Sequence, residues 1–419
     1  MSAFAREILQ ARSLLTTRFD QLSRRLDVAI QSLLDVDLRN WEREQRLATN
    51  GLPNSLSVSA TSSSSSSSSS SNPSSSSSSS QASKAQSLLN LIRTKGQKLA
   101  DILWKLSLCI EATKRRNEQL PDASSGGTLS RLIAVRERNN HHVTTLISGT
   151  MIVDRQPPQV LKTQTRFQCQ VRHLLGAHVA GGSGSGDGSC GGGGGGGGGG
   201  GEGRGTTLTP SSPSSTVTPT VTAHMINEAE YSKFMRGEKR VGVDAISDCG
   251  VIQNNVAKLD FNVKNRTLVA TFPNMQLKSI RRAEKKGERV AEEKFVILYH
   301  CQIDLQSPLL TSSNSASSSS TSSSSSSPAS PTSTAMTCHA WTVSSAMGVI
   351  VHASQECNTF GTIFWDNAFA APRRESFATP EFVAWQDLAA SLNSCFAATT
   401  GRHLSPTNIE FLRMKLLQV

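Results

Sequence analysis

The sequence lacks the features that mark secreted, disulfide-bonded or membrane-spanning proteins. No two of its eight cysteines lie closer than 19 positions, so it has neither a CxxC clip nor the cysteine density of a disulfide scaffold. It contains no run of about 18 apolar residues, which a membrane helix would require. Five arginines fall within the first 30 residues on a helical pattern, unlike a signal peptide. We expect a soluble, intracellular chain with free thiols and no membrane association.

Catalytic and cofactor-binding motifs are also missing. The sequence contains no GxSxG, Walker A or HExxH motif, and no GxGxxG that follows a strand. His141 and His142 are adjacent and cannot share one helix face, which argues against a zinc site there. Glu292 and Glu293 are better explained as solvated carboxylates than as a catalytic pair, because no partner accompanies them. We therefore expect no enzymatic activity, no cofactor and no metal.

Homopolymeric serine and glycine tracts divide the 419 residues into three segments that can fold. Aromatic residues make up only 5% of the chain, but the shortfall is concentrated in these tracts. Between them the composition is ordinary. We predict domains at residues 1–151, 152–369 and 370–419, with disordered inserts at 52–84, 181–215 and 311–334.

Apolar periodicity predicts long helices in the first segment. One helix runs to about Ala48, before the glycine and proline at 51 and 53; a second starts near Leu88 and a third runs from about Thr128 to Met151. The connections favour antiparallel packing in a bundle. The predicted apolar seams are Leu15, Phe19, Leu22, Leu26, Ala29, Leu33 and Val36 in the first helix, and Leu88, Ile92, Leu99, Ile102, Leu106 and Cys109 in the second.

After Pro157 and Pro158 the period changes to two, which is typical of strands. Alternation from Leu161 to Val171 predicts one half-buried strand with a basic outer face. Because several short strands follow without helical crossovers, we predict an antiparallel sandwich or barrel. These further strands are centred on 217–225, 259–263, 268–272, 295–303 and 349–351, and the turn at 264–266 predicts a hairpin.

The last segment returns to a helical pattern. We predict one helix with Thr379 as its N-cap and Phe382 on its apolar face, and another that begins at Ser405 and Pro406.

The net charge of +11 favours a polyanionic partner. A basic cluster lies between two predicted strands, and a loop of this charge can follow a phosphate backbone. A solvated surface loop explains the composition equally well. The cluster contains no aromatic residue, which favours duplex contacts over base stacking. Its members are Lys278, Arg281, Arg282, Lys285, Lys286 and Arg289.

Several segments resemble the signal transducer and activator of transcription (STAT) family in colinear order. RQPPQVLKTQTRF (155–167) resembles the start of the family's DNA-binding domain, and FPNMQLKSIRRAEKKG (272–287) its basic loop. VIVHASQECNTFGTIFWDNAFAAP (349–372) resembles the end of the DNA-binding barrel. LLDVDLRNWEREQRLATNG (33–51) is similar to the end of the family's second coiled-coil helix, and residues 379–416 are similar to its linker domain. The likeness is strongest to insect members and to the prolactin-responsive branch.

The resemblance implies a multidomain α + β fold: an antiparallel helical bundle (coiled coil), an immunoglobulin-like or p53-like antiparallel β-barrel, and a short helical linker domain. It also implies a latent transcription factor of the JAK-STAT pathway that moves from cytoplasm to nucleus. Its partners would be duplex DNA, an importin-type receptor and proteins that bind the coiled coil, with a homodimer only in the full-length phosphorylated form. By position, His352 would face the groove, where an imidazole can contact a base edge, although a histidine there can also simply cap a strand end. Lys278, Arg281 and Arg282 match basic positions linked to import and DNA, while Lys162, Lys285 and Lys286 would contact phosphates.

Departures from the family pattern suggest a partial chain. The phosphotyrosine-binding domain and its tail tyrosine have no counterpart, and the only tyrosines are Tyr231 and Tyr299. A lysine expected in the second DNA-binding strand falls near Thr222, which removes one cation that would meet a phosphate. The first coiled-coil helix is also absent, which would leave apolar surface uncovered. The alternative hypothesis is therefore a scaffold that does not bind DNA, with the basic loop serving nuclear import alone.

Overall fold

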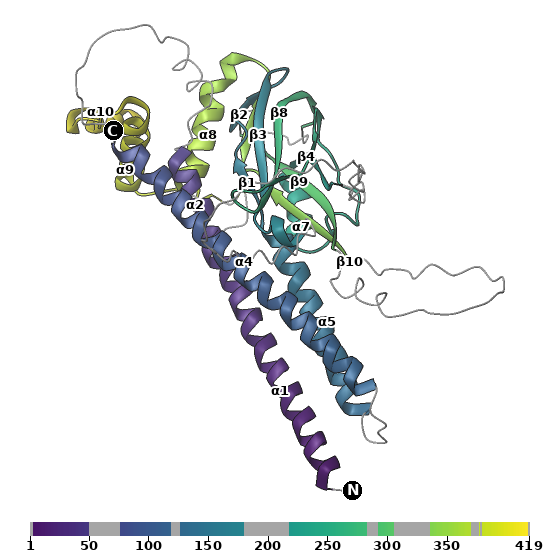
Figure 1. Ribbon diagram of the computed structural model, residues 1–419. Helices are drawn as coiled ribbons and strands as arrows, with labels where there is room; N and C mark the ends of the chain where they lie inside the picture. The colour runs from purple at the N-terminus through teal and green to yellow at the C-terminus, as the bar shows by residue number, and fades with distance from the viewer. Residues whose placement is uncertain are drawn as a thin grey trace, which may run out of the picture.

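The computed structural model describes residues 3–49, 76–118, 126–179, 218–282, 292–305, 336–369, 377 and 379–417. Within these ranges, long helices form an extended arm that lies against a curled eleven-stranded sheet, and two further helices close the chain (Figure 1). The predicted multidomain α + β class is confirmed. The predicted inserts at 181–215 and 311–334 lie outside the described residues.

The first long helix is continuous but contains a π segment. It consists of α1 (Ala3–Gln31), the π helix η1 (Ser32–Asp37) and α2 (Leu38–Thr49). The buried stripe advances in steps of three or four through Leu26, Ile30 and Leu33, and then takes a step of five to Leu38. A π segment inserts one extra residue into a helical turn, which explains the longer step.

The predicted seam of this helix is wrong at three positions, because Leu15, Leu22 and Val36 are exposed. Thr16 and Ser23 are buried in their place. The prediction kept Phe19, Leu26 and Leu33 but paired them with apolar residues four positions earlier, whereas the buried positions lie three earlier, at Thr16, Ser23 and Ile30. The sequence favoured the apolar Leu15 and Leu22, and the packing buries the small polar residues beside them.

Two more long helices complete the arm, α4 (Ser76–Glu118) and α5 (Gly126–Gly149). The start of α4 corrects the predicted disordered insert, since residues 76–84 are helical; a helix already nucleated can extend through serine at small cost. In α4 the predicted Ile102 and Cys109 are exposed, whereas Ala100 and Leu103 are buried. The predicted third helix ends at Gly149, because Met151 already begins a strand.

The sheet orders its main strands β1-β3-β8-β5-β4-β9-β11-β2, with β10 on β9, β6 on β4 and β7 on β8. The predicted hairpin is confirmed as β7 and β8, where Asn262 pairs with Thr267. The prediction of a wholly antiparallel sheet is wrong, because β11 and β2 pair in parallel. The strands are β1 (Met151–Arg155), β2 (Val160–Lys162), β3 (Arg166–His173), β4 (Thr220–Asn227), β5 (Gly250–Gln253), β6 (Val256–Lys258), β7 (Asp260–Asn262), β8 (Thr267–Ile280), β9 (Lys294–Leu305), β10 (Met336–Val343) and β11 (Met347–Ile350).

Helix α8 (Glu356–Phe369) packs closely on β11. A Cβ atom added at Gly348 would meet Thr359 Cγ2 at 2.1 Å, so this contact requires glycine. A buried ion pair anchors the same helix, with Lys294 Nζ of β9 at 2.7 Å from Asp366 Oδ1. The start of β11 is therefore fixed to both β9 and α8.

The remaining helices are short. The first predicted C-terminal helix begins later than expected, because Ala384 is its N-cap and Phe382 is 87% exposed. Ser405 does cap the next helix, since its Oγ accepts from the Asn408 N–H at 3.2 Å. These elements are α6 (Gly176–Val179), α7 (Glu228–Met235), the 3₁₀ helix η3 (Ala353–Gln355), α9 (Trp385–Thr400) and α10 (Pro406–Leu417).

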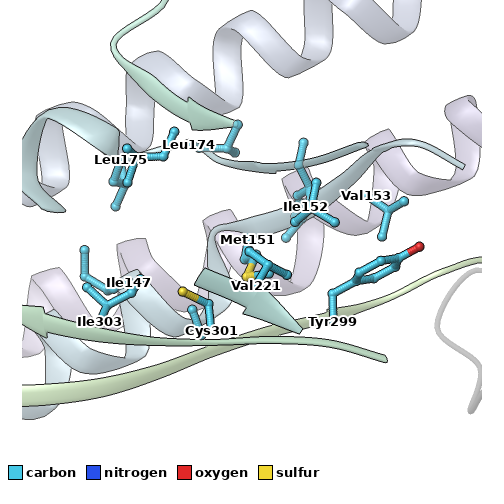
Figure 2. Close-up of a cluster of buried hydrophobic side chains, with 14 of the residues drawn as sticks. Ile147, Met151, Ile152, Val153, Leu174, Leu175, Val221, Tyr299, Cys301 and Ile303 are labelled. Carbon is cyan, nitrogen blue, oxygen red and sulfur yellow. The ribbon is translucent and has the colours of Figure 1, made fainter. Parts of the chain in front are cut away.

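One hydrophobic core runs from the long helices into the sheet. We call the contact of α2 and α5 with β1, β3 and β10 the junction. Figure 2 shows Ile147, from the end of α5, among side chains of the sheet such as Cys301 and Ile303. Beside it, fully buried His173 has its Nε2 at 3.0 Å from the Ile147 carbonyl oxygen, while its Nδ1 accepts from the Leu175 N–H at 3.3 Å. A neutral imidazole satisfies both bonds, and burial lowers the pKa of His173 to about 4.

In the described parts of the chain, no helix is both long enough and apolar enough to cross a membrane.

Candidate functional site

Three segments far apart in sequence converge at one end of the sheet, and we call this end the basic rim. It comprises residues 162–166, 276–282 and 349–352, which together hold five lysines and arginines and no Asp or Glu. In Figure 1, β2, β3 and β8 reach the end of the sheet where the chain enters α8. The rim brings together five of the predicted site residues, Lys162, Lys278, Arg281, Arg282 and His352.

The turn between β2 and β3 is tied to β8 through Gln164. This residue has a left-handed φ of 65°, which is unfavourable for a residue with a side chain. Three hydrogen bonds offset that cost. The Gln164 N–H donates to the Leu277 carbonyl at 2.8 Å, and Gln164 Nε2 donates to the Lys278 carbonyl at 2.7 Å. The Gln164 carbonyl accepts from Gln276 Nε2 at 2.5 Å. The Lys278 backbone is thereby fixed, while its side chain stays half-exposed.

The same turn is tied to β11. Lys162 pairs with Ile350 in the parallel ladder, and the Thr163 N–H donates to the Ile350 carbonyl at 3.0 Å. Lys162 is exposed, as is Arg166, the first residue of β3, whose partner on β8 is Gln276. The two cations flank the fixed turn.

His352 lies immediately beyond β11 and is exposed. It occupies the N-cap position of η3, and its backbone N–H donates to Gln355 Oε1 at 3.2 Å, as does that of Val351 at 3.0 Å. The backbone is held by Gln355, and the residue is exposed at the rim. This placement is compatible with both sequence interpretations, a base contact and a capped strand end.

Arg281 and Arg282 extend toward different neighbours. Arg281 is exposed and its guanidinium donates to the Asp248 carbonyl, on the side of β5. Arg282 turns toward β11, where its Nη2 donates to the Val349 carbonyl at 2.6 Å. Its Nη1 lies 3.3 Å from Glu293 Oε2, and its side chain is only 20% exposed. The two arginines therefore differ, because Arg282 has a carboxylate partner and little contact with solvent.

The other two predicted site residues, Lys285 and Lys286, lie outside the described residues.

Sequence reasoning missed Gln164, Gln276 and Arg166. Arg166 could have been found, since it belongs to the segment that contains Lys162 and has the same charge. The two glutamines are uncharged and act through backbone carbonyls more than 100 positions away, so no local signal marks them. Chemically, the rim presents cations and hydrogen-bond donors to a polyanion. Among the residues the structure describes, no three His, Cys, Asp or Glu side chains are grouped so that they could hold a metal.

Comparison with known families places these segments in context. Residues 155–183 and 208–323 match the family described as "STAT protein, DNA binding domain". Residues 372–419 match "Signal transducer and activator of transcription, linker domain". A protein of Drosophila melanogaster named "Signal transducer and transcription activator" is 31% identical to the chain over 274 residues. That match covers 65% of the chain and 28% of the relative, so the chain spans little more than a quarter of the relative's length.

Proposed function

The chain belongs to the signal transducer and activator of transcription family, and from this premise we propose that it is a transcription factor of the JAK-STAT pathway whose basic rim binds duplex DNA. One observation carries the proposal. Three distant segments meet at a single end of the sheet, and they contribute five cations and no carboxylate. Such a surface attracts the phosphate backbone and releases condensed counterions when it binds.

Within the rim, Lys162, Lys278 and Arg166 are assigned to phosphates. Lys162 and Arg166 are exposed, and Lys278 is half-buried. His352 is assigned to a base edge, because it projects beyond the last strand and an imidazole can donate or accept a hydrogen bond there. Lys285 and Lys286 would extend the same phosphate track.

The rest of the activity follows from family membership. We infer that the long helices are the family's coiled-coil domain, that the sheet is its p53-like barrel, and that the protein shuttles from cytoplasm to nucleus. Dimerisation would require the phosphorylated full-length protein. A single copy of this chain touches one half-site, so we expect weak, salt-sensitive binding.

A titration with a fluorescent 20-base-pair duplex of mixed sequence tests the rim. In the double variant Lys162→Gln/Lys278→Gln, affinity at low salt falls roughly tenfold, and the slope of log K against log salt becomes shallower by about 0.9 for each phosphate that is no longer neutralised. The matched control is Lys98→Gln, an exposed lysine on α4 remote from the rim. If both variants gave the same affinity and slope, the rim would not be the interface.

The alternative is a scaffold that recruits proteins through the long helices and uses the basic segment only for nuclear import. It is favoured by exposed apolar side chains on the arm, among them Leu15, Leu22 and Ile102. The lysine variants separate the two functions when nuclear entry is scored beside DNA binding. Reduced entry with unchanged DNA affinity would support the scaffold.

A further inference from the structure

Arg282 fills a gap in the hydrogen bonding of the sheet. The ladder between β11 and β9 ends where Gly348 pairs with Lys294. Gly348 and Ile350 both bond toward β2, since the Gly348 N–H donates to the Gln159 carbonyl and the Ile350 carbonyl accepts from Thr163. The backbone N–H and C=O groups of successive residues point to opposite sides of a strand. The Val349 carbonyl therefore points away from β2, toward the side of β9, at a position where β9 no longer pairs with β11.

The Arg282 guanidinium occupies this position. Its Nη2 donates to the Val349 carbonyl at 2.6 Å, in place of the strand partner that β9 no longer supplies. Glu293, the residue before β9, holds Nη1 at 3.3 Å, and the guanidinium lies 5.9 Å from the centre of the Phe295 ring. The rigid, planar fork of arginine makes several directed bonds at once, which the single ammonium of lysine does not reproduce.

We propose that Arg282 is a positioning residue for His352 rather than a contact to phosphate. By bonding the carbonyl of Val349, it fixes the end of β11 three residues before His352. Its charge is already neutralised by Glu293, so little of it is available to DNA. The proposal rests on the proposed function only in assigning a DNA-binding role to His352.

Hydrogen exchange on the chain without DNA tests the clamp directly. The variant Arg282→Lys keeps the positive charge but removes the planar guanidinium, so it separates the effect of hydrogen-bond geometry from the effect of charge. We expect the Val351, His352 and Gln355 amides to exchange about tenfold faster or more, because a charge-assisted hydrogen bond is removed. Amides of β1 and β3 should be unaffected, which shows that the variant is folded. Unchanged exchange at 351–355 would overturn the proposal.

Titration with the mixed-sequence duplex gives opposite predictions for clamp and phosphate contact. If Arg282 is a clamp, Arg282→Lys and Glu293→Gln both weaken binding several-fold, and the salt slope stays unchanged in Arg282→Lys. If Arg282 contacts a phosphate, Arg282→Lys retains affinity, Arg282→Gln makes the slope shallower by about 0.9, and Glu293→Gln binds more tightly because it frees a cation. Lys278→Gln serves as the phosphate-contact reference.

The two proposals fail in distinguishable ways. Should the unmodified chain bind no duplex even at low salt, the proposed function fails, while the exchange experiment still decides whether Arg282 holds β11. Should the chain bind DNA but Arg282→Lys leave both exchange and affinity intact, only the positioning role is refuted.

Discussion

The junction and the basic rim both use side chains to hold backbone carbonyl groups, but side chains of different charge. At the junction, neutral His173 bonds the Ile147 carbonyl, and neutral Gln45 bonds the carbonyls of Val153 and Asp154. At the rim, Arg282 bonds the Val349 carbonyl while a carboxylate balances its charge. The junction is buried and the rim is partly open to solvent.

The difference shows how stability and binding are separated in this molecule. A buried neutral imidazole such as that of His173 responds to protons, because charging it in the core is unfavourable. Half-exposed ions respond to salt, which screens them. We expect acid to loosen the junction first and salt to act mainly at the rim.

The largest effect is expected below the rim, at the buried pair of Lys294 and Asp366, which are 12% and 2% exposed at their side chains. Asp366→Ala leaves the ammonium without its carboxylate, and we expect unfolding to become easier by about 3–5 kcal/mol. Urea denaturation measures this. The double variant Lys294→Met/Asp366→Leu should recover most of the stability, because it removes both buried charges. If the double variant is no better, the ion pair is not the cause.

The next effect is the acid sensitivity of the junction. His173 has a folded pKa of about 4 and an unfolded value near 6.5, so the unfolded chain takes up the proton first. The contribution of neutral His173 to the free energy of unfolding is complete above about pH 6.5 and is lost as the pH falls toward 4. The total loss is about 3 kcal/mol.

Urea midpoints between pH 7 and pH 4 measure this dependence. His300 also has a pKa lowered to about 4 by burial and shifts stability in the same direction. The comparison with His173→Gln isolates the junction, since glutamine keeps a donor for the Ile147 carbonyl and does not titrate. An equally steep pH dependence in that variant would exclude His173 as the sensor.

The smallest effect is expected at Gln45, where α2 meets β1. Its Nε2 donates to two carbonyls, each at 3.0 Å, and its Oε1 accepts from Gln156 Nε2 at 3.0 Å. Gln45→Ala should reduce the free energy of unfolding by about 1 kcal/mol, the usual net value of a neutral hydrogen-bond group. Asn40→Ala, an exposed position on the same helix, is the control. Equal reductions in the two variants would show that this contact adds nothing to the junction.

Sequence periodicity predicted the parts of the fold that repeat locally. Strand β9 and the β7–β8 hairpin follow from alternation and a short turn, and the long helices follow from their apolar spacing. Strand β1 was missed, because Met151, Ile152 and Val153 are all buried and continue the apolar character of the helix before them. A strand without alternation has no period to detect.

Charge predicted the rim, and tertiary contacts then decided the role of each cation. Lys278, Arg281 and Arg282 look equivalent in sequence. Only the fold shows that Arg282 reaches a carbonyl 67 positions away and pairs with Glu293, whereas Arg281 is exposed and extends toward Asp248. Contacts of such long range leave no pattern within a short window, so the sequence could locate the site without distinguishing its members.

The π segment at Ser32–Asp37 sets the rotational phase between the two halves of the first long helix. With one additional residue in that turn, Leu33 and Leu38 are both buried although they lie five positions apart, and α1 packs on α5 while α2 packs on α4 in an unbroken helix. Removal of a single residue from the turn would rotate every following side chain by about 100° about the helix axis. Either α1 or α2 would then present its polar side inward, so the length of this segment is constrained as tightly as its composition.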